Sequence, residues 1–119
     1  MSNLVQQSEQ KEVNRIEELI AQAWKAHSKK EEDNAEELFR KAYTLDPKSV
    51  EAVYGLAMVL KAQERLKEAS NLFQQVIQIL DEKPARDPNR ASMLKRLAMA
   101  HLNRIQTGDW NLEKEIWQR

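Results

Sequence analysis

The two histidines, His27 and His101, are the side chains of this sequence best suited to proton transfer or to binding a soft metal ion. The chain has no cysteine, which excludes a disulfide framework, a thiolate metal site and a cysteine nucleophile. Neither histidine belongs to a motif with a paired carboxylate, and the sequence contains no glycine-rich phosphate loop, HExxH motif or nucleophile elbow. We therefore predict that the protein is not an enzyme and uses no metal ion or cofactor.

Charged side chains could bind a charged partner, although the chain has 19 basic and 19 acidic residues. Residues 1–82 carry 11 basic and 15 acidic groups, and residues 83–119 carry 8 and 4. The basic residues at the start of the second part, with only Asp87 against them, are Lys83, Arg86, Arg90, Lys95, Arg96 and Arg104. Two interpretations stay open, a solvated face or a docking edge for an acidic protein segment. Nucleic acid is not expected, because no aromatic residue interleaves with these charges.

The elements that carry these residues are predicted to be helices. A chain of 119 residues has the size of one domain with one core. Its two glycines and three prolines leave few turns for an all-β or α/β protein. Apolar residues recur three and four positions apart, and no stretch alternates like a strand. We predict an all-α fold with one domain over residues 1–119.

Six helices are expected, separated by charge changes, prolines and capping residues. They span about residues 8–29, 31–45, 50–63 and 65–80, then a fifth from Pro88 and a sixth from Trp110. Asp46 precedes a proline and should end the second helix, because this position disfavours helical backbone. Ser49 is the expected N-cap of the third helix, and Asp87 that of the fifth.

The first ten residues contain no basic cluster and no apolar run longer than Leu4-Val5. Neither a secretory signal nor a membrane-spanning segment is expected from such a pattern. Ser2 also stands where myristoylation requires glycine. We predict a cytoplasmic protein without a membrane partner.

The apolar pattern repeats itself after 34 residues. This shift superposes Leu19 on Val53, Ala23 on Ala57, Ala35 on Ala69, Leu38 on Leu72 and Phe39 on Phe73. A small residue lets the two helices of a hairpin cross closely, and an aromatic residue one turn later fills the wedge beside the crossing. The pairs Ala35 with Phe39 and Ala69 with Phe73 have this spacing.

With this period the chain resembles the tetratricopeptide repeat family, whose second helices carry Ala, Phe and Pro at fixed positions. The resemblance covers about residues 14–118. It implies a right-handed superhelix of about three antiparallel helix-turn-helix repeats. These are expected at about residues 14–47, 48–82 and 89–119, with a linker at 83–88 and seven extra residues before the third repeat. Three repeats are about the fewest that are stable alone.

The resemblance also implies a function, because the first helices of successive repeats in this family line a concave groove that holds peptides or extended segments. The register places in this groove Ile20, Trp24, His27, Tyr54, Met58, Lys61, Lys95, Met99 and Leu102. Methionine and aromatic side chains suit an adaptable binding surface. The alternative is that the chain's own N-terminus or C-terminal helix covers these residues.

Two tryptophans, Leu112 and Ile116 lie in the last ten residues, whereas repeat arrays normally end in a polar capping helix. A homodimer that buries Trp110, Ile116 and Trp117 is one explanation, and a helix that folds back on its own core is another. Two functions therefore stay open. The first is a protein-protein interaction module that binds a partner peptide in an apolar groove, and the alternative is a self-associating structural protein.

Overall fold

The computed structural model describes residues 2–82 and 87–107, with the side chains of the first helix described from Gln7 onward. The described residues form helices α1 (Ser2–Ser28), α2 (Glu32–Leu45), α3 (Val50–Ala62), α4 (Leu66–Glu82) and α5 (Pro88–Thr107). No strand occurs among them, so the predicted all-α fold is confirmed. The expected sixth helix, with Trp110, Ile116 and Trp117, lies outside the described residues.

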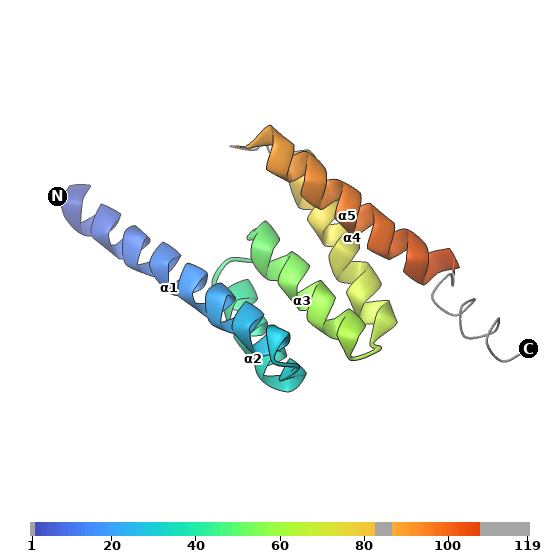
Figure 1. The fold of residues 1–119 in the computed structure, drawn as a ribbon. Helices are drawn as coiled ribbons and strands as arrows, with labels where there is room; N and C mark the ends of the chain where they lie inside the picture. Colours follow the sequence, from blue (N-terminus) through green and yellow to red (C-terminus); the bar gives the residue numbers. More distant parts are fainter. Residues whose placement is uncertain (1, 83–86, 108–119) are drawn as a thin grey trace, which may run out of the picture.

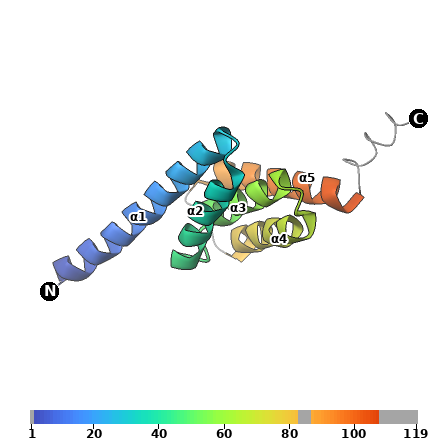
Figure 2. The ribbon, with the colours of Figure 1, turned by 90° about the horizontal axis from the view of Figure 1, so that it is seen from below.

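The helices pack in chain order, each against the next, and α1 also touches α3. Figures 1 and 2 show an array with α1 at one end and α5 at the other. The first helix has 27 residues and its partner α2 has 14, so the N-terminal half of α1 extends past α2 (Figure 1). Because residues 2–7 include good helix formers, α1 begins at Ser2 and not near Ser8 as expected.

The backbone itself repeats with the period of 34 residues. Lys30 and Glu64 are 34 positions apart and have nearly the same left-handed conformation, with φ of 63° and 62°. In both turns the next backbone N–H donates to a carbonyl five residues earlier, Ala26 and Leu60, over 2.9 Å. This arrangement closes the C-terminal turn of a helix. The two hairpins are therefore structural repeats.

The predicted capping residues act as expected. The Oγ of Ser49 accepts a hydrogen bond from the backbone N–H of Ala52 over 3.3 Å at the start of α3. Asp87 Oδ1 accepts two, from the backbone N–H groups of Asn89 and Arg90, at the start of α5. Such contacts satisfy backbone donors that have no partner within the helix.

The core is formed by the apolar residues that the helices turn towards one another. Its largest fully buried side chains are Phe39, Phe73, Leu56, Leu60, Val53, Val59 and Val76. The ring of Phe39 lies so close to α3 that a Cβ added at Gly55 would be 2.2 Å from its Cε1 atom. Glycine at this position allows α2 to approach α3, because any side chain would overlap the ring.

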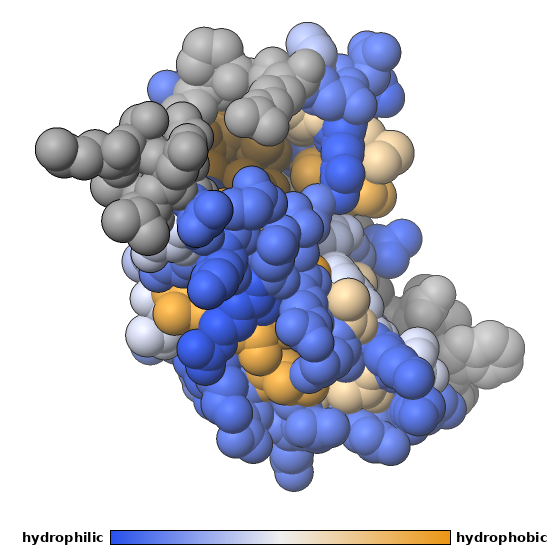
Figure 3. Space-filling view, turned by 90° about the vertical axis from the view of Figure 1, so that its left-hand side faces the viewer, coloured by the Kyte–Doolittle hydropathy of each residue, from blue (hydrophilic) through white to orange (hydrophobic). Residues whose placement is uncertain are grey.

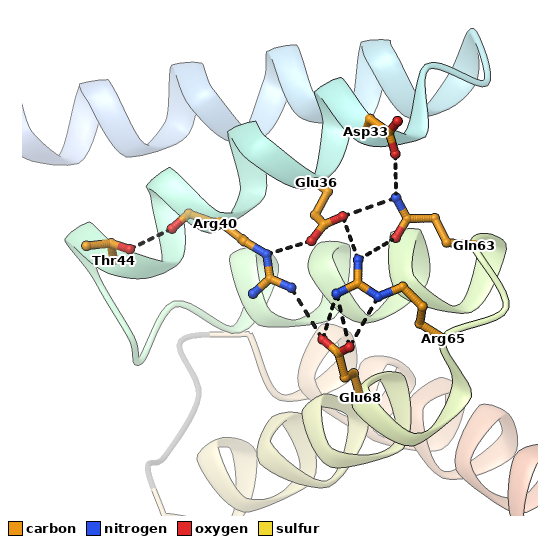
Figure 4. Close-up of polar contacts among 7 residues, drawn as sticks. All are labelled: Asp33, Glu36, Arg40, Thr44, Gln63, Arg65 and Glu68. Carbon is orange, nitrogen blue, oxygen red and sulfur yellow. Dashed lines mark hydrogen bonds and ion pairs between the residues drawn. The ribbon is translucent and has the colours of Figure 1, made fainter.

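A polar cluster joins the two hairpins on the outside (Figure 4). Glu36 of α2 accepts hydrogen bonds from Arg40 over 2.7 Å and from Arg65 over 2.8 Å. Gln63 also donates to Glu36, and Glu68 of α4 accepts from both arginines. Burial raises the pKa of Glu36, but the hydrogen bonds outweigh it and hold this pKa below its ordinary value. The cluster fixes α2 against α4.

Candidate interaction surface

Three rings from three different helices form a continuous row. The ring centroids of Trp24 in α1 and Tyr54 in α3 are 6.4 Å apart, and those of Tyr54 and His101 in α5 are 6.3 Å apart. All three side chains are half-buried. We call Trp24, Tyr54 and His101 the ring row. It runs across the first helices of the hairpins and across α5.

Two buried phenylalanines support the ring row from below. Trp24 meets Phe39 edge to face with centroids 5.1 Å apart, and Tyr54 meets Phe73 at 6.0 Å. His101 stacks on Phe73 at 5.0 Å, with an angle of 14° between the planes. Edge-to-face and stacked contacts of this kind stabilise aromatic pairs beyond the area they bury. The ring row is therefore held in place by the core residues of both hairpins.

A lysine of α3 contacts the histidine at the end of the row. Lys61 Nζ lies 2.8 Å from His101 Nδ1. Burial lowers the pKa of His101, and the positive charges of Lys61 and Arg104 lower it further. The neutral imidazole can only accept here, because an ammonium group has donors and no acceptor. Burial and Arg104 also lower the pKa of Lys61.

The other histidine lies at the opposite end of the row. His27 Nδ1 donates to Glu32 Oε2 over 2.8 Å, and its ring meets Trp24 edge to face at 5.8 Å. Burial raises the pKa of Tyr54 between them, which keeps the phenol protonated.

Five of the residues expected in the groove lie on this side of the molecule. Trp24 and Tyr54 belong to the row, His27 touches Trp24, and Met58 is half-buried one turn after Tyr54. Lys61 contacts His101. Ile20, in contrast, is 6% exposed and packs in the core, so it offers little surface to a partner.

The three residues expected from α5 lie elsewhere. Lys95 Nζ pairs with Asp81 Oδ1 of α4 over 2.6 Å. Met99 and Leu102 line a hollow beside Ile77, also in α4. The residue of α5 in the ring row is His101, which was not among the groove residues expected from the repeat register. The linker before α5 contains two prolines and interrupts the 34-residue repeat. The sequence therefore does not show how α5 is rotated about its own axis, and this rotation decides which of its residues face the ring row.

Two of the six basic residues noted between Lys83 and Arg104 form ion pairs within the fold. Arg90 forms an ion pair with Glu51 of α3, and Lys95 forms one with Asp81 of α4.

No described helix has both the length and the apolar character needed to cross a bilayer. Within residues 2–82 and 87–107, no three His, Cys, Asp or Glu side chains are grouped so as to hold a metal ion.

Antiparallel helix pairs that stack in chain order and repeat after 34 residues define a helical-repeat scaffold. The profile of the tetratricopeptide repeat family matches residues 26–98, from the last turn of α1 into α5. The chain belongs to the tetratricopeptide repeat family, which in general provides non-enzymatic protein-protein interaction modules. Comparisons with curated proteins and with solved structures gave no match.

Proposed function

We propose that this protein binds a segment of a partner protein along the ring row. The observation that carries the proposal is the continuous row of half-buried rings from α1, α3 and α5. Hairpin cores need the buried Phe39 and Phe73, but they do not need further rings at the surface. Half-buried aromatic side chains in fixed positions are typical of residues that dominate binding energy in protein interfaces.

The partner segment that fits this surface is extended and carries apolar side chains. Trp24 and Tyr54 offer flat apolar faces, and Met58 beside them can adapt to different side chains. The surface has a polar side chain at each end, His27 at one and Lys61 at the other. Met99 and Leu102 line the hollow beside Ile77, Lys95 pairs with Asp81, and these three residues of α5 are not part of the proposed site.

Selection from a library of random linear peptides tests this proposal. Peptides selected on the wild-type chain should bind Met58→Lys at least about tenfold more weakly, a loss of about 1.4 kcal/mol. The matched control is Gln74→Lys, an equal charge change at an exposed position of α4. Binding to both variants is measured well below their melting temperatures, so that loss of folding does not mimic loss of binding. Selected peptides that bind Met58→Lys as tightly as the wild type would contradict the proposal.

Two further predictions, on the class of partner and on the location, remain part of the proposal. The partner is a protein and not a nucleic acid, and the protein works in the cytoplasm. The alternative function, a homodimer through Trp110, Ile116 and Trp117, concerns residues outside the described part of the chain. Light scattering tests it, because Trp117→Ala should then reduce a dimeric mass to that of the monomer.

A further inference from the structure

Large exposed hydrophobic side chains occur only on the two end helices of the described array. Val13 of α1 is 46% exposed, and Met93, Leu97 and Met99 of α5 are 54%, 40% and 52% exposed. Helices α2, α3 and α4 each have neighbours on two sides, whereas α1 and α5 lie at opposite ends (Figure 1). Figure 3 views the molecule from the α1 side and shows hydrophobic residues visible between hydrophilic ones. The terminal repeats of such arrays need a polar outer face for solubility, so exposed apolar residues on the end helices favour association.

The first helix carries unneutralised negative charge. Between Gln7 and Leu19 it has four glutamates and two basic residues. The glutamates are Glu9, Glu12, Glu17 and Glu18. In the part of the chain that the structure describes, none of these four forms an ion pair. The extension of α1 therefore presents acidic side chains around the exposed Val13.

The last described helix carries the opposite charge. Its 20 residues include four basic and no acidic side chains. Arg90 and Lys95 are neutralised by Glu51 and Asp81. Arg96 and Arg104 have no carboxylate partner among residues 2–82 and 87–107. Among the described residues, the exposed apolar side chains of α5 are thus accompanied by positive charge that no carboxylate pairs with.

We propose that a second copy of this chain docks its α1 against α5 of the first copy. Contacts between two α5 helices or between two α1 helices would place like charges opposite each other, which disfavours a symmetric dimer. The α1-to-α5 contact joins opposite charges and buries Val13 of one copy against Met93 and Leu97 of the other, which share one face of α5. It is a head-to-tail contact, so it continues into a chain of copies or closes into a ring.

This contact should be weak and sensitive to salt. A helix of 20 residues is about 30 Å long, so two such helices side by side bury an area at or below the usual range of about 1,200–2,000 Å² for stable complexes. Exposed charges attract one another within about 10 Å at 0.1 M salt, and less at higher salt. Association should therefore appear at high protein concentration and low salt.

Sedimentation of the full chain with charge-reversed variants tests the head-to-tail contact. Wild type should exceed the monomer mass at low salt and return to it at high salt. Glu12→Lys and Arg96→Glu should each lower the mass, because each reverses one charge on one end. An equimolar mixture of the two variants should restore association, since each chain keeps one original end and the two changed ends are complementary.

The control is Lys67→Glu, which makes the same charge change as Arg96→Glu at an exposed position of α4. It should leave the wild-type mass unchanged. The proposal is overturned by a wild type that stays monomeric at low salt, or by an association that Glu12→Lys does not reduce. It is also overturned if the mixture stays monomeric, or if Lys67→Glu weakens association as much as Arg96→Glu.

Discussion

The imidazole of His101 stacks on the ring of Phe73, with centroids 5.0 Å apart and 14° between the planes. This contact places the histidine of α5 on the core of the second hairpin, beside Lys61 and Tyr54. A neutral ring suits this place, because Lys61 and Arg104 already supply positive charge there. The packing of α5 is therefore linked to the protonation of one residue.

Acid should loosen α5 through His101. Its pKa is lowered in the folded protein, so the unfolded chain binds the proton more tightly. The stability that the neutral ring contributes is fully present above the unfolded-state pKa of 6.5, and it is lost as the pH falls from that value through the lower folded-state pKa. Melting temperatures measured from about pH 7 down to about pH 5 should fall more steeply for the wild type than for His101→Phe.

The phenylalanine keeps the stack on Phe73 and cannot titrate, so it isolates the contribution of the proton. His27→Gln serves as the control, because it leaves His101 in place and should retain the steep dependence. Equal slopes for the wild type and His101→Phe would show that protonation of His101 does not affect the fold.

The two phenylalanines under the ring row should dominate stability. Phe39→Ala and Phe73→Ala each remove a fully buried ring and should cost about 3–5 kcal/mol. That is a large share of the about 5–15 kcal/mol available to a domain. Gln63→Ala removes hydrogen bonds to Asp33 and Glu36 at the surface and should cost about 0.5–1.5 kcal/mol. Denaturant unfolding measures all three, and equal losses would refute the repeat register.

Gly55 should not tolerate even a methyl group. Alanine is the better helix former by about 1 kcal/mol. The new Cβ would nevertheless overlap the ring of Phe39, and overpacking costs about 1–3 kcal/mol or more. Gly55→Ala should therefore lower the free energy of unfolding, and Phe39→Leu in the same chain should relieve part of the loss. Two losses that simply add would mean that the ring and the methyl group do not meet.

The turn after α1 should gain stability from glycine. Lys30 has φ of 63°, a conformation that costs a side-chain-bearing residue about 1 kcal/mol. Lys30→Gly should raise the free energy of unfolding by about 0.5–1 kcal/mol. Lys41→Gly, in the middle of α2, should lower it by a similar amount. Thermal unfolding of both variants would contradict this account if Lys30→Gly were also destabilising.

The sequence predicts the two hairpins well because their residues repeat after 34 positions with no interruption. Ala35 and Phe39 recur as Ala69 and Phe73, and all four are fully buried as expected. The resemblance to the tetratricopeptide repeat family is confirmed by the match over residues 26–98. The sequence also predicts helix ends correctly where a single side chain determines them, as Ser49 does at the start of α3.

The surface was harder to predict than the core, because it depends on how α5 is rotated. Lys95 was expected to face the groove, yet it pairs with Asp81 of α4. His101 was not among the residues expected in the groove, yet it ends the ring row. The linker before α5 interrupts the 34-residue period, so the positions of the first two repeats cannot be extended across it. Contacts between helices, and not periodicity, decide which residues lie together here.

The central claim is that a partner segment lies on the ring row, and mapping a bound peptide by nuclear magnetic resonance tests it most directly. A peptide selected from the random library is titrated into the full chain. The indole N–H signal of Trp24, the Met58 methyl signal and the ring signals of Tyr54 should shift together as the peptide binds. Shifts confined to outward residues of α2 and α4, with the Trp24 indole unchanged, would contradict the claim.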